Sequence, residues 1–140
     1  MRSKFFAGLV ISAVGLAVHA AEPASVKDGI LVDSSGRTLY TFDKDAPSKS
    51  NCNAGCAAIW PPLVAASDAR PSGNFNLVAR DDGSSQWTYR DKPLYRYAAD
   101  QKPGDTTGEK FGGVWHTVRL GTSADTSQSV KAGGDYGYRY

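Results

Sequence analysis

Short runs of strand-forming residues, separated by turn-forming residues, make up most of the chain. Gly29 to Val32 is one such run, Asp33 to Gly36 is typical of a turn, and Arg37 to Phe42 is a second run. This pattern predicts an antiparallel β-hairpin in which Gly36 supplies the residue with positive φ. The polar residues before it, 21–28, are interpreted as an entry segment, and no strand is predicted there.

A similar pattern follows in the second half. Apolar and polar residues alternate from Phe75 to Arg80, which predicts a half-buried strand, and Asp81 to Ser84 is a turn sequence. Gln86 to Tyr89 and Leu94 to Tyr97 then flank Arg90 to Pro93. These residues predict a second hairpin.

The last apolar run, Val114 to Leu120, predicts a final strand. Alternation along a strand places Val114, His116, Val118 and Leu120 on one face. The glycine-rich stretch from Gln101 to Gly113 before it is expected to be a loop. Residues 121–140 are rich in serine, threonine and glycine and are expected to form a flexible tail.

One motif occurs twice at a constant separation. Both copies read Leu-Tyr-x-aromatic-x-x-Asp, and an offset of 55 residues relates Tyr40 to Tyr95 and Asp45 to Asp100. We therefore expect two related units, at about 29–65 and 84–120. A unit of this size is too small to be stable alone, so the units are expected to share one core within a single domain, residues 21–120. The same offset relates Trp60 to Trp115, Ile59 to Val114 and Leu63 to Val118.

The segment from Asn51 to Pro62 predicts a short helix that carries both cysteines. Asn51 or Asn53 can cap its N-terminus, and Pro61-Pro62 ends it. Gly55 weakens the helix, so no more than two turns are expected. The predicted fold is therefore mainly β: two pseudo-symmetric antiparallel hairpin repeats that share one core, with a short helical Cys-bearing segment.

The first 20 residues are typical of a secretory signal peptide. Two basic residues precede an apolar run from Phe5 to Val18, and small residues flank the expected cleavage after Ala20. The run is shorter than a membrane-spanning helix needs, although a retained membrane anchor is the alternative. A lipid anchor needs a cysteine at the cleavage point, and the first cysteine is Cys52. We therefore expect an exported chain, periplasmic or secreted, with no stable membrane insertion after cleavage.

Removal of this leader also changes the charge balance. The chain has 16 Lys+Arg and 14 Asp+Glu, and the leader holds Arg2 and Lys4, so 16 − 2 leaves 14 against 14. Nucleic-acid binding needs a basic face, and this balance provides none. Nucleic acid is therefore excluded as a partner.

The two cysteines, Cys52 and Cys56, have three possible roles. In an exported chain a lone pair is most often a disulfide, and i, i+4 spacing on a helical turn is compatible with one. A thiolate metal site with His116 as third ligand is the second possibility. A redox-active pair is the third, although the Cys-x-x-Cys spacing is absent.

Six motifs occur in a characteristic order along the chain: Leu-Tyr-x-Phe-x-x-Asp (39–45), Ser-x-Cys-x-x-x-Cys (50–56), Trp-Pro-Pro-Leu (60–63), Gln-Trp-Thr-Tyr (86–89), Lys-Pro-Leu-Tyr-x-Tyr-x-x-Asp (92–100) and Trp-His (115–116). Together these motifs resemble the bacterial secreted-repeat family, whose members are described as predicted lipoproteins with a Tyr-x-(Phe/Trp/Tyr)-x-x-Asp motif. The resemblance covers about residues 26–120 and implies an exported two-repeat β domain without an established activity. The lipid anchor is not carried over, because no cysteine stands at the cleavage point.

The motif aromatics allow two interpretations. They could form a platform that stacks on a sugar ring or another flat ligand, or they could pack as the core between the two repeats. In the core, the tyrosine hydroxyls would need partners, and Asp45 and Asp100 are the candidates, each reaching a tyrosine of the opposite copy or the backbone of its own turn. His116 is expected to be a satisfied, partly buried residue. The candidate binding residues are Tyr40, Phe42, Asp45, Tyr95, Tyr97, Asp100, Trp60 and Trp115.

The absence of a serine, histidine and acid constellation favours a non-enzymatic module. We expect it to bind a cell-envelope ligand or protein in an aromatic-lined groove between the repeats, without a cofactor. The alternative is a metal-binding or redox protein that uses Cys52, Cys56 and His116. A third possibility is a hydrolase in which Asp45 and Asp100 act as acid and base.

Overall fold

The computed structural model describes residues 22–121. The predicted signal peptide, residues 1–20, and all but the first residue of the predicted tail lie outside these described residues. No helix within 22–121 is long and apolar enough to cross a membrane. The elements are β1 (Ala24–Lys27), β2 (Ile30–Asp33), β3 (Tyr40–Phe42), α1 (Gly55–Ile59), β4 (Phe75–Ala79), β5 (Ser85–Tyr89), β6 (Lys92–Pro93), the 3-10 turn η1 (Phe111–Gly113) and β7 (Trp115–Thr117).

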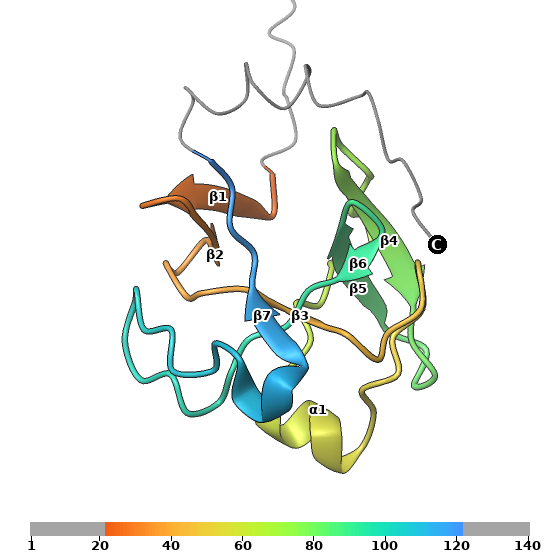
Figure 1. Ribbon diagram of the computed structural model, residues 1–140. Coiled ribbons are helices and arrows are strands. Elements are labelled where there is room, and N and C mark those ends of the chain that lie inside the picture. The colour runs from red at the N-terminus through yellow and green to blue at the C-terminus, as the bar shows by residue number, and fades with distance from the viewer. Residues whose placement is uncertain (1–21, 122–140) are drawn as a thin grey trace, which may run out of the picture.

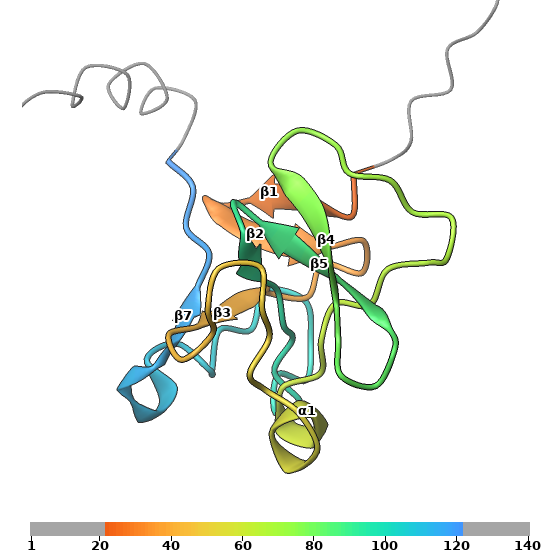
Figure 2. The same ribbon diagram turned by 90° about the vertical axis from the view of Figure 1, so that its right-hand side faces the viewer.

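The strands form three small antiparallel sheets, which agrees with the mainly β prediction. Their orders are β1-β2, β3-β7 and β4-β5-β6. In Figure 1, the β3-β7 pair lies between the β1-β2 ribbon and the β4-β5-β6 sheet. In Figures 1 and 2, α1 lies at the end of the molecule opposite β1.

The polar entry segment contains a strand that was not predicted, because residues 24–27 form β1. This strand pairs with β2 from Ala24↔Asp33 to Lys27↔Ile30. Asp28 and Gly29 form the connecting turn, with φ of 51° and 77°. Asp-Gly with both φ positive is the preferred two-residue hairpin turn. The Asp-Gly dipeptide therefore indicated a hairpin more strongly than the polar composition around it argued against one.

Both predicted hairpin turns are present, but the first hairpin is shorter than predicted and the second has a different turn, since residues 40–42 pair with β7 rather than with β2. The turn from Asp33 to Gly36 forms as expected, with Gly36 at φ 78°, and it places Thr38 opposite Val32. In the second hairpin, the turn is only Arg90-Asp91, with φ of 48° and 65°. Strand pairing therefore continues through β6, where a four-residue turn was expected.

The final strand is shorter than predicted and presents the opposite face. Only Trp115–Thr117 forms β7, and Trp115 and Thr117 are buried while His116 is partly exposed. The face with Val114 and His116 is therefore only partly buried, and Trp115 and Thr117 form the buried face. His116 is partly buried and paired with Asp43, as expected.

The short helix is confirmed, but its predicted caps were wrong. Ala54 stands at the N-cap with φ 49° and no side chain caps the helix. The side-chain amide of Asn51 instead donates to the Lys44 carbonyl (2.7 Å). The Asn53 amide donates to Asp81 (3.1 Å), so both asparagines tie the loop to distant residues rather than to the helix end.

The two repeats are interlocked rather than side by side. The strand of the first tyrosine motif, β3, pairs with β7 of the second repeat, in the register Tyr40↔Thr117. The equivalent residues 55 positions away, Tyr95 and Pro62, form an isolated bridge. At the centre, the backbone amide of Tyr40 donates to the Tyr95 carbonyl (2.8 Å), and the backbone amide of Tyr95 donates to the Tyr40 carbonyl (3.0 Å). Each repeat therefore completes the other, about a pseudo-two-fold axis.

The buried side chains form two clusters, each contributed by both repeats. The aromatic cluster is centred on Tyr40, Tyr95, Trp60 and Trp115, with Cys52. A shared core was predicted, and it is divided between this cluster and an aliphatic one. The aliphatic cluster contains Ala24, Leu31, Leu39, Leu63, Ala65, Phe75, Trp87 and Leu94.

Candidate functional site

A symmetric stack of four rings forms the centre of the molecule. The indoles of Trp60 and Trp115 lie 3.8 Å apart between ring centroids at an interplanar angle of 4°. Tyr97 stacks on the outer face of Trp60 (4.2 Å) and Phe42 on that of Trp115 (4.3 Å). Because the 55-residue offset also relates Phe42 to Tyr97, the two halves of the stack are equivalent.

Each motif tyrosine donates its hydroxyl to the aspartate of the other repeat. Tyr40 Oη donates to Asp100 Oδ2 and Tyr95 Oη to Asp45 Oδ2, both at 2.7 Å. Both tyrosines are fully buried. Burial, reinforced by the neighbouring carboxylate, raises the pKa of each phenol well above its ordinary value of 10.0. The expected role of the aspartates as tyrosine partners is confirmed.

The second oxygen of each aspartate holds the loop that follows its motif. Asp45 Oδ1 accepts from the backbone amide of Asn51 (2.7 Å). Asp100 Oδ1 accepts from the backbone amide (3.0 Å) and the hydroxyl of Thr107. Burial raises the pKa of Asp45, although the hydrogen bonds from Asn51 and Tyr95 act against it. These carboxylates therefore join the tyrosines to the long loops.

A buried arginine that the sequence patterns did not single out supports the first of these loops. The Arg80 side chain donates to Gln86 Oε1 (2.7 Å), Ser50 Oγ (3.0 Å) and the Cys52 carbonyl (2.8 Å). The Ser50 hydroxyl in turn lies 2.7 Å from Tyr95 Oη. Arg80 stands at the end of a strand, beside a turn, where a charged residue is usually exposed, so its spacing gave no indication of burial.

The cysteines form a disulfide, as the first interpretation predicted. Cys52 and Cys56 have Cα atoms 5.2 Å apart and an S–S distance of 2.02 Å. The thiolates that a metal site would need are therefore bonded to each other. His116, the third ligand of that alternative, pairs instead with Asp43, with Nε2 2.8 Å from Oδ2. Residues 22–121 contain no group of three potential metal ligands.

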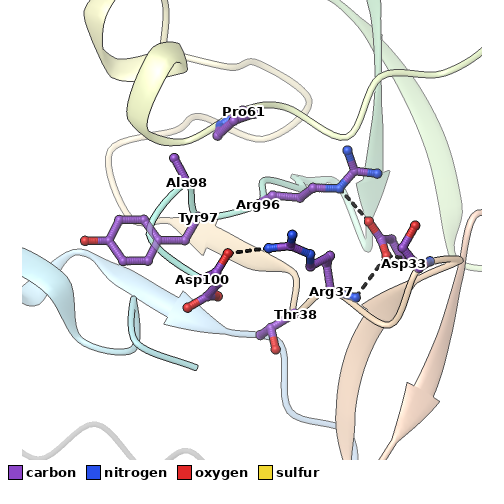
Figure 3. A pocket seen from close by; sticks show the side chains of 9 residues that line it. Asp33, Arg37, Thr38, Pro61, Arg96, Tyr97, Ala98 and Asp100 are labelled. Carbon is purple, nitrogen blue, oxygen red and sulfur yellow. Dashed lines mark hydrogen bonds and ion pairs between the residues drawn. The ribbon is translucent and has the colours of Figure 1, made fainter. Parts of the chain in front are cut away.

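A hollow of about 470 Å³ opens at the junction between the repeats (Figure 3). One wall comes from the first hairpin turn and the other from the segment that follows the second tyrosine. Arg96 Nε donates to Asp33 Oδ2 (2.5 Å) across it, and Arg37 donates to the Asp100 carbonyl. We name this hollow the arginine hollow; its lining residues are Asp33, Ser35, Arg37, Thr38, Pro61, Arg96, Tyr97, Ala98 and Asp100.

A second hollow, of about 330 Å³, is the pseudo-symmetric counterpart of the first. The 55-residue offset relates Phe42 to Tyr97, Asp45 to Asp100 and Lys92 to Arg37, each pair in equivalent walls. We name it the lysine hollow. It is lined by Thr41, Phe42, Asp43, Asp45, Ala46, Pro47, Arg90, Asp91, Lys92 and Pro93.

The sequence-derived candidates therefore divide into two groups. Tyr40, Tyr95, Trp60 and Trp115 are at most 4% exposed, as the core interpretation expects. Phe42 and Tyr97 are half-buried at the two ends of the ring stack. Each lines one hollow, together with the aspartate of its own motif: Tyr97 and Asp100 in the arginine hollow, Phe42 and Asp45 in the lysine hollow.

Comparison with known proteins agrees with this two-fold architecture. A family model described as a secreted repeat of unknown function matches residues 23–64 and again residues 76–119. The chain belongs to this family of secreted repeats. Both matches begin at or next to the first strand of a repeat, β1 or β4. No curated protein and no solved structure matched the chain.

Proposed function

We propose that this protein is a non-enzymatic, exported module that binds a ligand or partner of the cell envelope at the junction between its repeats. The arginine hollow is the observation that carries the proposal. It is open to solvent, of ligand size, and lined by polar groups with one aromatic ring, Tyr97. The lysine hollow offers a second site of related shape.

Export is supported by the secreted-repeat family and by the leader sequence. A binding role is supported by how the candidate catalytic groups are used. Asp45 and Asp100 line different hollows, and each holds a tyrosine and a loop, so they do not face one substrate as an acid and base pair. The disulfide removes the free thiolates that a metal site at Cys52 and Cys56 would need.

The test is a titration of the mature chain, residues 21–140, with cell-wall glycan fragments, followed by amide chemical-shift changes. We expect saturable shifts at residues of the arginine hollow. Tyr97→Ala should abolish these shifts, whereas Val26→Ala, which shortens an exposed apolar side chain outside both hollows, should preserve them. A circular dichroism spectrum of each variant checks that the fold is intact.

Two results would contradict the proposal. One is the absence of saturable binding by any glycan fragment or envelope-protein peptide tested. The other is saturable binding whose shifts map outside both hollows and are unchanged in Tyr97→Ala and Phe42→Ala. Hydrolysis of a fragment during the titration would instead indicate an enzyme.

A further inference from the structure

The two hollows differ in charge at equivalent positions. Where the lysine hollow has Thr41, the arginine hollow has Arg96, and where the former has Asp43, the latter has Ala98. At these two positions the arginine hollow has one more cation and one fewer anion, whereas Arg90 lines the lysine hollow where the arginine hollow has Ser35. Over the whole lining each hollow therefore has two cations, and the arginine hollow has two carboxylates where the lysine hollow has three. Since the backbone scaffold is duplicated, this difference indicates that the hollows prefer ligands of different charge.

Asp33 makes the arginine hollow a built site. Its side chain is 1% exposed, and it accepts from Arg96 Nε at 2.5 Å and from the Arg37 amide at 3.0 Å. One buried carboxylate therefore holds the side chain of Arg96 and the backbone of Arg37. The equivalent residue in the second repeat is Thr88, whose buried hydroxyl has no hydrogen-bond partner within residues 22–121. The arrangement in which a buried carboxylate contacts two arginines is therefore present in the arginine hollow and not in the lysine hollow.

Both guanidinium groups keep donors for a ligand. Arg96 uses only Nε, and Arg37 uses only Nη1, in their hydrogen bonds to residues 22–121. In Figure 3, Arg37 reaches across the hollow toward Asp100, and the terminal nitrogens of Arg96 lie beyond its bond to Asp33. Arg37 forms no ion pair with a carboxylate in the described part of the chain. Asp105, a partly exposed neighbour, already accepts from two backbone amides.

We propose that the arginine hollow binds the carboxylate of an acidic sugar. This inference rests on the proposed function and names its ligand class. A guanidinium fork matches a planar carboxylate, the Ser35 hydroxyl lies in the wall to meet sugar hydroxyls, and Tyr97 offers a ring face. A singly charged carboxylate fits better than a dianionic phosphate, because Asp33 pairs with Arg96 and leaves Arg37 as the cation without an ion pair. The other carboxylate of the hollow, Asp100, is held by hydrogen bonds from Tyr40 and Thr107.

Glucuronate and glucose are matched probes, because they differ at one carbon by a carboxylate. In amide chemical-shift titrations of the full mature chain, glucuronate should saturate the hollow and glucose should bind about tenfold more weakly. Added salt should weaken glucuronate binding. Ala98→Asp, which introduces the residue found in the lysine hollow, should lower glucuronate affinity about tenfold by like-charge repulsion.

Ala98 is exposed, so this substitution leaves the core intact. Asp43→Ala, the reciprocal change in the other hollow, is the control and should leave glucuronate affinity within about twofold, because Asp43 lies outside the arginine hollow. Arg96→Lys retains the charge but loses the fork, and should also weaken binding.

The outcomes separate the two proposals. Equal binding of glucose and glucuronate at the hollow would overturn the acidic-sugar inference and leave the binding function intact. Glucuronate binding that Ala98→Asp does not change, or shifts outside the hollow, would overturn it too. If neither sugar binds while a neutral glycan or peptide from the earlier panel does, only the ligand class is wrong. Failure of every probe removes both proposals.

Discussion

Trp60 lies flat against Trp115, its own counterpart in the other repeat, with ring centroids 3.8 Å apart. The pseudo-two-fold axis passes between these two indoles, so the duplicated half meets itself at its largest side chain. Tyr40 and Tyr95 meet edge-on with Trp60 and Trp115 in the same way on the two sides. The aromatic cluster therefore exists only when both repeats are folded together.

A chain cut between the repeats tests this interlocking. Neither the fragment 22–66 nor the fragment 67–121 should fold alone, because β3 and β7 come from different fragments. Mixing the two should restore strand-rich circular dichroism and chemical-shift dispersion. A stably folded monomer of either fragment by itself would contradict the interlocked arrangement.

Absorbance at alkaline pH should show two classes of tyrosine. The folded-state pKa of Tyr40 and of Tyr95 lies above the ordinary 10.0, so the stability they contribute is complete below pH 10 and is lost as pH rises further. Of the seven tyrosines in the chain, we expect two to ionise only as the protein unfolds. Tyr40→Phe should leave one late-ionising group, whereas smooth titration of all seven before unfolding would be inconsistent with the buried pairs.

Removal of either buried hydroxyl should destabilise the fold. Tyr40→Phe and Tyr95→Phe each leave a motif aspartate short of a donor, and we expect each to lower the free energy of unfolding by about 1–3 kcal/mol. Tyr97→Phe is the control, since the Tyr97 hydroxyl makes no hydrogen bond to residues 22–121. Urea denaturation measures all three. A loss in the control as large as in the other two would count against the Tyr–Asp pairs.

Gly108 is required for close packing rather than for backbone freedom. A Cβ at this position would lie 2.6 Å from Trp60 and 3.0 Å from Tyr40. Gly108→Ala should therefore lower the free energy of unfolding by about 1–3 kcal/mol. At Gly55, in α1, nothing lies within 4 Å of such a Cβ, and Gly55→Ala should be neutral or stabilising by about 0.5–1 kcal/mol. Thermal unfolding of both variants measures the two changes in stability. Equal changes would show that the aromatic cluster rearranges easily around an added methyl group.

Reduction of the disulfide should weaken the fold modestly. The bond closes a loop between Cys52 and Cys56 only, for which the loss of chain entropy corresponds to about 2 kcal/mol. Arg80 still holds the Cys52 carbonyl, so the loop should keep its place in the reduced protein. Urea unfolding with and without reductant measures the difference. Complete unfolding on reduction would mean that the disulfide, rather than the aromatic cluster, holds the second half of the first repeat.

Local sequence patterns were sufficient for the repeat, the hairpins and the disulfide. The 55-residue offset is a property of the sequence itself, and a lone cysteine pair in a chain with an export leader has one common chemistry. The β1 strand was missed because polar composition was weighed above the Asp28-Gly29 turn. The assignment of the Tyr–Asp pairs succeeded because a buried hydroxyl needs an acceptor and only the motif aspartates recur with the tyrosines.

The sequence by itself determined that the chain is a duplicated β domain with matched tyrosines and aspartates, because motif, spacing and turn residues are local. Only the tertiary structure decided that the repeats exchange their last strands, that Arg80 is buried, and that the hollows differ in charge. These features depend on which distant surfaces meet, as between Asp33 and Arg96, 63 positions apart. Periodicity along a chain reports which face of a strand is buried, but not what covers that face.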